Sequence, residues 1–379
     1  MSTQEDLLSL LNHIKLDEMQ DLCLGKGKFY PFTMRQLKFF CNPNHSYRYR
    51  RFNIQKKSGS TRQISTPINH TFLILLQSIN EMFKAMYSPS EHAMGFVKKR
   101  SVVTNAAIHR SQNYIFNTDL KDFFSSIEQT RVWKRLQQEP FNFPIAIANI
   151  LAGLCTMREN RKNADGKDIY TYILPQGAPT SPIITNMICD TLDRRLAGIA
   201  KRFGLNYTRY ADDITFSSNH YVYSKNGEFM KELIRVIEGQ GFRINEDKTR
   251  LQKRGCRQEV TGIIVSDKLN VTQKYVREIR SLLFIWEKYG YFDAMRRFLP
   301  RYKAEKGYRK KGNPKLYNVL EGKLLYLKMV KGDSDSVYIR LNNKFQELCK
   351  RDSWIFGPFS ADGKHMHLNG KIKKWIFSI

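Results

Sequence analysis

The sequence contains no hydrophobic run long enough to cross a membrane. Its longest apolar stretches, around Phe72–Leu76 and Ile145–Leu154, fall short of the roughly 20 residues that a membrane-spanning helix needs. Residues 1–20 alternate acidic and basic residues around a helical stripe of leucines, and they lack the basic start and apolar core of a signal peptide. We therefore expect a protein that stays in the cytoplasm and has no membrane partner.

Acidic residues are scarce relative to basic ones. The 379 residues include 35 Asp and Glu against 63 Lys and Arg, which gives a net charge of +28. Such an excess repels itself unless a polyanion neutralises it, and with a membrane set aside we expect nucleic acid as the partner. Hydrophobic residues, at 41%, are as frequent as in ordinary globular proteins. A chain of 379 residues is long enough for two or three compact units, each with its own core.

Cysteine and histidine give no sign of a metal site. The six cysteines are scattered, with no CxxC pair, and we expect them to remain free thiols in or near the core. His365 and His367 flank Met366 without a second ligand pair nearby, so we expect the face of a short strand rather than zinc ligands. There is also no internal repeat and no long low-complexity segment.

The spacing of apolar residues predicts a mixed α/β region followed by a helical one, with short helices over residues 1–50. Strands are expected at about 51–55, 62–65, 114–120, 168–174, 206–210, 214–218, 242–244, 249–254 and 258–265. Helices are expected at about 69–87, 101–110, 128–138, 143–157, 181–203, 225–240, 272–288, 290–298, 313–330 and 334–350. Polar segments at 158–167 and 301–315 are expected to be loops.

Acidic residues mark the ends of two predicted strands. Asp212 and Asp213 lie at the tip of a predicted hairpin, and Asp119 lies at the end of the strand at 114–120. Asp is common in turns, so a structural role is the ordinary alternative. Two adjacent acids repel each other, however, and a third at a neighbouring strand end would complete a pocket of the oxygen ligands that Mg²⁺ prefers. Two such ions, about 3.5–4 Å apart, support in-line phosphoryl transfer.

Four segments resemble, in order, the motifs of reverse transcriptases. They are Asp119 with Phe123 and Phe124, then Leu174–Pro182, then Tyr210–Asp213, and finally Gly241–Asn245 followed by Lys248 and Thr249. Two more segments, Asn105–His109 and Val260–Gly262, resemble the Asn-Ala-x-x-His and Val-Thr-Gly elements of retron reverse transcriptases. The resemblance covers about residues 50–270 and is weak for the first 50 residues.

The resemblance implies an α+β right-hand polymerase with fingers, an antiparallel palm sheet and a helical thumb. N-terminal helices and fingers are expected at 1–112, the palm at 113–270 with an inserted fingers segment at about 128–180, the thumb at 271–350 and an extension at 351–379. It also implies an RNA-directed DNA polymerase with two Mg²⁺ ions per active site. A primer hydroxyl would attack the α-phosphate of a dNTP and release pyrophosphate.

The motif register implies a role for each matching residue. Asp119 and Asp212 would be the principal metal ligands, with the Leu120 carbonyl assisting and Asp213 beside them. Arg62 and Lys57 would hold the dNTP triphosphate, Gln176 and Gly177 would let the backbone approach the new base pair, Lys248 would neutralise charge in the transition state, and Phe124 would exclude a 2′-hydroxyl. The ordinary alternatives are surface cations at Arg62 and Lys248 and a core aromatic at Phe124.

Further residues are assigned to nucleic acid. Tyr210 would pack beside the primer terminus, and the retron-like elements, with Asn105, His109, Val260, Thr261 and Gly262, would contact RNA. A structural hydrogen bond is the alternative for His109, and a strand bulge is the alternative for Gly262. Lys274, Arg277 and Arg280 recur at helical spacing, and together with Arg309, Lys310 and Lys311 they predict a thumb that binds a duplex.

The retron resemblance implies partners as well as an activity. These are a dedicated noncoding RNA that serves as template and primer, its branched cDNA product, dNTPs, and an effector protein in anti-phage defence. Two alternatives stay open: a reverse transcriptase of a non-retron defence or group II-like lineage, and an RNA-binding scaffold that has lost catalysis. The intact Asp119, Asp212 and Asp213 disfavour the scaffold.

Overall fold

The computed structural model describes residues 3–21, 30–45, 48–55, 59, 61–162, 166–306 and 313–356. The chain divides into two compact units that interleave along the sequence. The first comprises Met1–Phe96, Thr118–Ile214 and Val222–Thr249, and the second comprises Val97–Asn117, Thr215–Tyr221 and Arg250–Ile379. Each unit therefore collects segments from distant parts of the chain.

Helices and two antiparallel ribbons make up much of the first unit. Its helices are α1 (Gln4–Asp21), α2 (Met34–Cys41), α3 (His70–Met86), α5 (Gln129–Leu136), α6 (Ile145–Cys155), α7 (Ser181–Arg202) and α8 (Glu228–Gly239). The ribbons are β1 (Tyr49–Gln55) with β2 (Thr61–Pro67), and β4 (Met157–Lys162) with β5 (Asp168–Ile173). Side-chain caps fix helix starts: Thr33 and Gln36 form a capping box at α2, and Asn69 caps α3.

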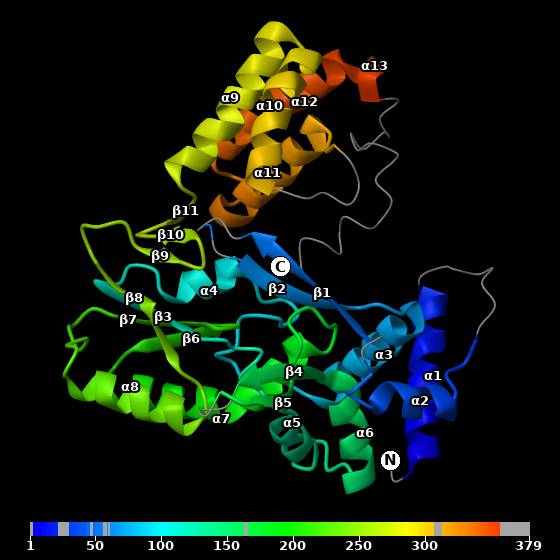
Figure 1. Cartoon of the computed structure of the whole chain (residues 1–379). Coiled ribbons are helices and arrows are strands. Elements are labelled where there is room, and N and C mark those ends of the chain that lie inside the picture. Colours follow the sequence, from blue (N-terminus) through cyan, green and yellow to red (C-terminus); the bar gives the residue numbers. More distant parts are fainter. Residues whose placement is uncertain are drawn as a thin grey trace. The chain divides into compact units, whose positions relative to one another are not determined.

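A four-stranded sheet carries the acidic strand ends. Its order is β6 (Asn206–Tyr210), β7 (Asp213–Ser218), β3 (Tyr114–Leu120) and β8 (Ile244–Lys253). The two central strands are almost entirely buried, which explains their β-branched and aromatic residues. Helices α7 and α8 lie along one face of the sheet (Figure 1). Because β3 and β7 are neighbours, the end of β3 lies beside the turn that joins β6 to β7.

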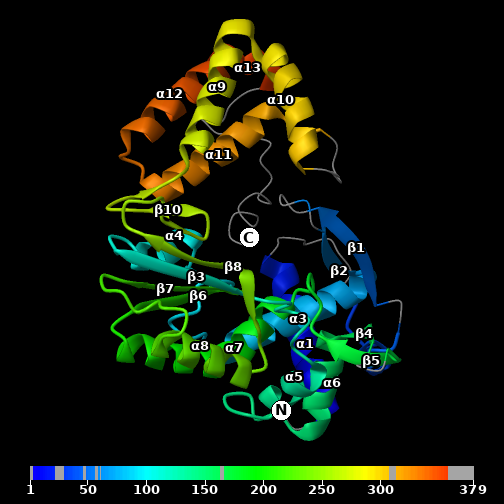
Figure 2. The ribbon, with the colours of Figure 1, turned by 60° about the vertical axis from the view of Figure 1, so that its left-hand side comes forward.

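The second unit joins a short helix and a small sheet to a helical bundle. Its elements are α4 (Val102–Ile108), β9 (Glu259–Val260), β10 (Ile263–Val265), β11 (Leu269–Asn270), α9 (Gln273–Tyr289), α10 (Tyr291–Lys306), α11 (Leu316–Lys331), α12 (Ser336–Arg351) and α13 (Ser353–Phe356). The three strands pair antiparallel in the order β11-β10-β9. Figure 2 shows helices α9–α12 gathered together.

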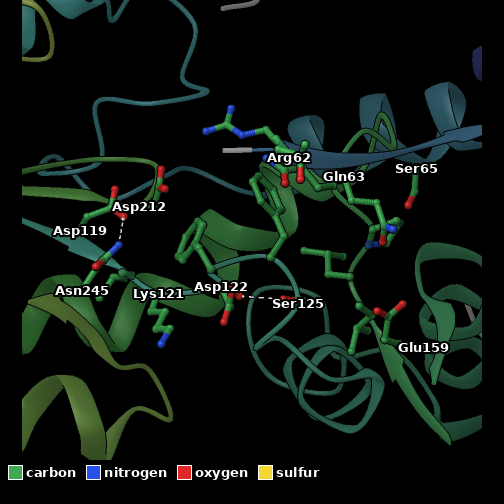
Figure 3. A pocket seen from close by; sticks show the side chains of 18 of the residues that line it. Arg62, Gln63, Ser65, Asp119, Lys121, Asp122, Ser125, Glu159, Asp212 and Asn245 are labelled. Carbon is green, nitrogen blue, oxygen red and sulfur yellow. Dashed lines mark hydrogen bonds between the residues drawn. The ribbon is translucent and has the colours of Figure 1, made fainter. Parts of the chain in front are cut away.

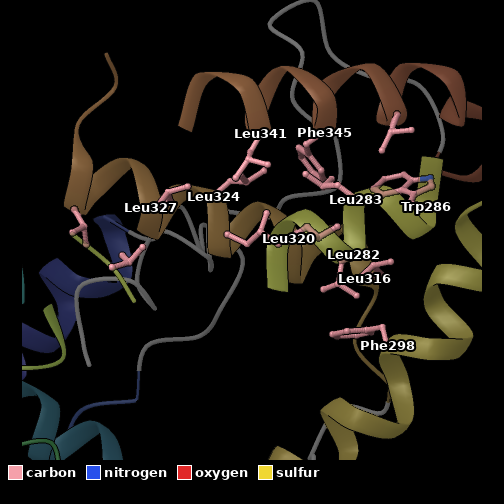
Figure 4. Packing of buried hydrophobic residues seen from close by; sticks show 14 of the residues in the cluster. Leu282, Leu283, Trp286, Phe298, Leu316, Leu320, Leu324, Leu327, Leu341 and Phe345 are labelled. Carbon is pink, nitrogen blue, oxygen red and sulfur yellow. The ribbon is translucent and has the colours of Figure 1, made fainter. Parts of the chain in front are cut away.

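One hydrophobic core runs through the second unit. Trp286, Leu320 and Phe345 pack together between α9, α11 and α12 (Figure 4). Ala106 of α4 and Val260 of β9 belong to the same core. The short helix and the small sheet are therefore packed as part of this unit rather than as separate surface elements.

The structure corrects several predicted boundaries. Residues 158–167, expected as a loop, include most of strand β4, whose polar residues lack the apolar alternation that marks a half-buried strand. One strand, β8 (Ile244–Lys253), takes the place of the strands expected at 242–244 and 249–254, and Phe242 and Arg243 precede it. The strand expected at 258–265 is interrupted by a turn at 261–262. The helix expected at 290–298 continues as α10 to Lys306, with Pro300 inside it.

The cysteine prediction is confirmed in part. Cys155, Cys189 and Cys349 are buried free thiols, as expected, and Cys41 is half-buried. Cys256 is exposed, so the prediction was wrong there, because this residue lies in the turn that follows β8. Cys23, His365 and His367 lie outside the described residues.

The predicted α+β fold class is confirmed: helices combine with small sheets and antiparallel ribbons. In the structure, α4 and β9–β11 belong to the same compact unit as the C-terminal helices. The division into fingers, palm and thumb at residues 112, 270 and 350 stays a prediction. Among the helices that the structure describes, none combines the length and the hydropathy needed to cross a membrane.

Candidate active site

The end of β3 and the β6–β7 turn meet at one cavity. The Leu120 N–H donates a hydrogen bond of 2.9 Å to the Asp212 carbonyl, and this bond ties the two segments together. Asp119 and Asp212 both line a cavity of about 440 Å³, and Figure 3 shows their side chains close together. Asp213, the first residue of β7, is not among the described residues that line this cavity.

Asp119 and Asp212 have different electrostatic surroundings. Asp119 Oδ2 accepts hydrogen bonds from the Lys248 ammonium at 2.7 Å and from Asn245 Nδ2 at 3.3 Å. Burial and the nearby charge of Asp119 raise the pKa of Asp212, and the charges of Lys248 and Arg62 offset this only in part. The two carboxylates therefore repel each other, and the nearby cations do not fully offset the effect on the pKa of Asp212.

This donor set fits a hard divalent cation. Carboxylate oxygens suit Mg²⁺, whereas softer metals prefer sulfur or imidazole ligands. Within the described ranges, no group of three or more His, Cys, Asp and Glu side chains is arranged to hold a metal. A cation here would be held by Asp119 and Asp212. It would complete its coordination shell with water or phosphate oxygens, as Mg²⁺ usually does.

A second wall of the cavity comes from β2 and the turn before α7. Arg62 and Gln176 line it, and the Ser65 N–H donates to the Gln176 carbonyl at 2.8 Å. Gly177 has a φ of +123°, and a Cβ there would lie 2.8 Å from the Ser65 carbonyl oxygen. Packing against β2 therefore already requires glycine, apart from any approach of a base pair. Lys57, expected beside Arg62, lies outside the described residues.

Two consecutive phenylalanines follow β3 and have different environments. Phe123 is 3% exposed and packs against Phe242, with ring centroids 5.6 Å apart. Phe124 is half-buried, lines the cavity, and lies 6.4 Å from the Phe96 ring. The structure thus places Phe123 mainly in the core and leaves Phe124 open to the cavity.

In the second unit, the two retron-like segments contact each other. Asn105 Nδ2 donates a hydrogen bond to Thr261 Oγ1 at 3.4 Å. Thr261 and Gly262 form the two-residue turn between β9 and β10, with φ of +47° and +83°. Positive φ at both positions is the type I′ pattern, which favours Asn-Gly and strains a β-branched threonine. One segment thus supports an unusual turn in the other.

Burial corrects the RNA contacts expected for Asn105, His109 and Val260. Each of these residues is at most 1% exposed. His109 Nδ1 lies 2.8 Å from Ser217 Oγ, and burial lowers the pKa of His109 to about 3, so its ring is neutral at pH 7. These side chains support the fold, because none of them has surface to offer to RNA. Thr261 and Gly262 keep exposed surface.

The remaining nucleic-acid candidates lie at several places. Tyr210, the last residue of β6, is half-buried, and burial raises its pKa. Lys274, Arg277 and Arg280 are exposed on α9, as their helical spacing predicts. Arg309, Lys310 and Lys311 lie outside the described residues.

Asn245 is a site residue to which the sequence argument gave no role, although it lies within the quoted segment Gly241–Asn245. Its hydrogen bond to Asp119 becomes evident only when β8 is paired beside β3. The sequence offered one indication of this role. Asn245 lies four residues before Thr249, in the same motif that places Lys248 at the site.

The sequence of this chain is similar to those of known proteins. Residues 54–273 match the family described as reverse transcriptase (RNA-dependent DNA polymerase). The Retron Mx65 reverse transcriptase of Myxococcus xanthus is 36% identical over 246 residues, covering 62% of this chain and 55% of that protein. The Retron Mx162 reverse transcriptase of the same organism is 32% identical over 273 residues, covering 66% of this chain and 55% of that protein.

The Retron Ec86 reverse transcriptase of Escherichia coli is 32% identical over 237 residues, covering 62% of this chain and 69% of that protein. The chain thus spans just over half the length of the two Myxococcus xanthus relatives. The matched part of the chain includes every residue named above as lining the cavity.

Proposed function

The chain belongs to the reverse transcriptase family, and we propose that it is the RNA-dependent DNA polymerase of a retron. The observation that carries the proposal is the meeting of Asp119 and Asp212 at one cavity, with Arg62, Phe124 and Gln176 around them. Carboxylates, a guanidinium fork and a planar aromatic are the groups needed to hold metal ions, phosphates and a sugar.

Each side chain then has a task in nucleotide transfer. Asp119 and Asp212 would hold two Mg²⁺ ions, assisted by the Leu120 carbonyl and with Asp213 beside them; when bound, the ions neutralise phosphate charge and favour ionisation of the attacking hydroxyl. Arg62 binds the triphosphate, Phe124 closes the space beneath the sugar, and Gln176 faces the new base pair. The primer oxygen bonds to the α-phosphorus, the bond to the bridging oxygen breaks, and pyrophosphate leaves.

Lys248 has two partners in this scheme. Without metal it neutralises Asp119, to which it donates at 2.7 Å. Its side chain is 53% exposed, so it is free to turn toward an incoming triphosphate when cations occupy the carboxylates. Lys248 would thereby stabilise the negative charge of the leaving pyrophosphate while the metal ions neutralise Asp119.

The domain assignment and the partners belong to the same proposal. Fingers at 1–112 and about 128–180, a palm in the rest of 113–270 and a thumb at 271–350 would hold a noncoding RNA and its growing cDNA. The similarity to retron enzymes supports a branched RNA–DNA product and, more remotely, an effector protein and an anti-phage role.

Sequencing the nucleic acid that copurifies with the protein tests the proposal. A retron enzyme should bring down one RNA species joined 2′–5′ to single-stranded DNA, shown by treatment with ribonuclease and a debranching enzyme before sequencing. DNA with a free 5′ end, copied from RNA supplied elsewhere, would instead support another reverse transcriptase lineage. RNA without DNA, together with no primer extension in vitro, would support a scaffold.

Replacing Lys274, Arg277 and Arg280 by Gln is expected to weaken RNA binding and to reduce its salt dependence. These residues share the exposed surface of α9, and removing one cation–phosphate interaction lowers the slope of log K against log salt by about 0.7–0.9, depending on the strand form. Filter-binding titrations across salt concentrations measure the slope. A matched control replaces three exposed cations near and on α8, namely Lys225, Lys231 and Arg235. Equal slopes for the two triple variants would contradict a specific role for α9.

Gly262→Val is expected to reduce self-primed synthesis more than extension of an annealed DNA primer. A Cβ at Gly262 meets no atom within 4 Å, so the main expected effect of a β-branched side chain there is strain at the +83° φ of the turn. Self-primed synthesis requires the protein to position the priming nucleotide of the RNA at the active site, whereas an annealed DNA primer is already positioned by base pairing with its template. Thr261→Asn, which suits a type I′ turn, serves as the control. If both reactions fall equally in Gly262→Val, the turn serves polymerisation in general.

A further inference from the structure

A buried ion pair lies beneath the turn that carries Asp212. Arg209 of β6 and Asp193 of α7 both have side chains that are 0% exposed. Arg209 Nε donates to Asp193 Oδ1 and Arg209 Nη2 donates to Asp193 Oδ2, each at 2.7 Å, which makes a bidentate pair. The Tyr207 hydroxyl donates to Asp193 Oδ1 at 2.8 Å.

Stability alone gives little reason for this pair. Removing two charges from water is costly, and well-packed apolar residues of similar volume often stabilise a protein as much as a buried ion pair does. A buried pair is better explained by a geometry that it enforces, so the other contacts of the guanidinium decide its role.

Those other contacts lead to the turn. Arg209 Nη1 donates to the Ala211 carbonyl at 3.1 Å, and Nη2 also donates to Asn186 Oδ1 at 3.2 Å. Ala211 has a φ of +57°, a left-handed conformation that is uncommon for a residue other than glycine. The strained residue is thus held at its carbonyl, one peptide before Asp212, by a fork anchored on α7.

The same network holds the turn from its other side. Asn186 Nδ2 donates to the Gly95 carbonyl at 3.0 Å. Gly95 lies against the turn so closely that a Cβ there would be 2.6 Å from the Ala211 nitrogen. Asn186 therefore binds both the guanidinium and the segment that covers Ala211, so that the strained residue has no room to relax.

We propose that Arg209, anchored by Asp193, is a positioning residue that fixes Ala211 in its left-handed conformation and thereby aims the Asp212 carboxylate at the metal site. The proposal rests on the function proposed above. The Leu120 N–H holds the Asp212 carbonyl at 2.9 Å, so the two carbonyls of the turn have separate anchors, one on β3 and one reaching back to α7.

Arginine is required because one side chain must reach three partners. Nε and Nη2 both donate to the Asp193 carboxylate, while Nη1 donates to the Ala211 carbonyl. A lysine keeps the positive charge, but its single ammonium group lacks the fork geometry that serves the carboxylate and the turn together. Arg209→Lys therefore removes the positioning contact with the smallest change in charge and volume.

A control arginine binds the same helix from another element. Arg135 of α5 donates to Asp190 of α7 at 3.0 Å, three residues before Asp193, and its other hydrogen bonds run to the carbonyls of Met187 and Glu139. Arg135→Lys thus weakens the contacts of an arginine with α7 that do not involve the catalytic turn.

The test measures cation binding directly as well as synthesis. Mn²⁺ binding to the full chain is followed by electron paramagnetic resonance, melting temperature is measured without metal, and primer extension is measured as kcat against Mg²⁺ concentration. Arg209→Lys is expected to bind Mn²⁺ about 10- to 100-fold more weakly, the range for residues that orient metal ligands, and to need correspondingly more Mg²⁺. Arg135→Lys is expected to melt lower with unchanged Mn²⁺ affinity and Mg²⁺ requirement.

The outcomes separate the two proposals. If the unmodified chain binds Mn²⁺ and makes DNA but Arg209→Lys matches it in both, the positioning role is wrong. If the unmodified chain neither binds Mn²⁺ nor makes DNA, the proposed function itself fails. Should Arg209→Lys not fold, Asn186→Ala, which removes one hydrogen bond to Arg209 and one to Gly95, is expected to weaken Mn²⁺ binding in the same direction, and wild-type binding there would overturn the positioning role.

Discussion

Asp212→Asn is expected to abolish DNA synthesis and, at the same time, to raise the melting temperature of the metal-free protein at pH 7. The synthesis is lost because an amide cannot replace a carboxylate that holds Mg²⁺. The stability rises because burial and the Asp119 charge raise the pKa of Asp212. An acid whose pKa is raised in the folded state stabilises the fold at low pH. That stabilisation is lost as pH rises from about 4 through the raised pKa. At pH 7 the ionised Asp212 side chain therefore lowers the free energy of unfolding.

Asp119→Asn is expected to abolish synthesis without the gain in stability. Asp119 accepts hydrogen bonds from Lys248 and Asn245, and an amide weakens the first of these. Either variant removes the repulsion between the two carboxylates, but only Asp119→Asn also weakens the ion pair with Lys248, and only Asp212→Asn removes the burial cost of the Asp212 charge. The two variants therefore share the loss of metal binding and differ in stability.

Both variants are measured in three assays. Primer extension on an annealed template gives activity, thermal unfolding in EDTA between pH 5 and 8 gives stability, and RNA titration confirms that binding is retained. More than a few per cent of residual synthesis in either variant would contradict the metal assignment. A melting temperature for Asp212→Asn that follows the unmodified protein at every pH would contradict the electrostatic argument alone.

The position of the site was predictable because its signals are local and ordered along the chain. Strand β3 and the hairpin β6–β7 are visible as alternating residues, and Asp119, Asp212 and Asp213 mark their ends. The motif order then predicts that these ends meet, and the Leu120 hydrogen bond to the Asp212 carbonyl shows that they do. Sequence thus predicts which residues converge when each lies on an element with a clear period.

Contacts between elements were not predictable in the same way. Arg209 reads in the sequence as a polar residue in a strand, and nothing in its neighbourhood indicates that Asp193 of α7 will lie against it. Likewise, β4 was not predicted because the ribbon that it forms with β5 leaves most of its residues partly or fully exposed. Its sequence therefore has no alternation of apolar and polar residues. Both features depend on how one element packs against another, which the residue types within either element do not specify.

The retron-like segments illustrate a third limit. A motif shows that residues matter without showing whether they bind a ligand or support one that does. Asn105 and His109 were expected to contact RNA, yet both are buried, and Asn105 hydrogen-bonds Thr261 of the other segment. Asn105 thus supports the turn at Thr261, whereas His109 lies 2.8 Å from Ser217 of β7, and only the packing of these elements distinguishes a supporting residue from one that contacts a ligand.

For the two phenylalanines after β3, the sequence pattern alone left open which ring lies in the core and which faces the sugar. Successive residues of an extended chain point to opposite faces, so one phenylalanine was expected in the core and the other at the sugar. Both rings line the cavity with Asp119 and Arg62, but Phe123 is only 3% exposed and packs against Phe242, whereas Phe124 is half-buried. Phe124 is therefore the more exposed of the two rings and stays the one proposed to meet the sugar.

Phe124→Ala is expected to admit ribonucleotides and to lower the preference for dNTP over rNTP by at least about tenfold, the effect of opening space for one small group in a closed pocket. The ring would otherwise occupy the volume that a 2′-hydroxyl needs. Single-nucleotide incorporation gives kcat/KM for each dNTP and rNTP pair. Phe242→Leu is the control: Phe242 is buried against Phe123 and is not among the described residues that line the cavity, so the variant should lower the melting temperature while the sugar preference stays unchanged. If Phe124→Ala folds, makes DNA and keeps the original preference, the sugar is selected elsewhere, and the ring of Phe124 serves only to pack against Phe96 and Phe123.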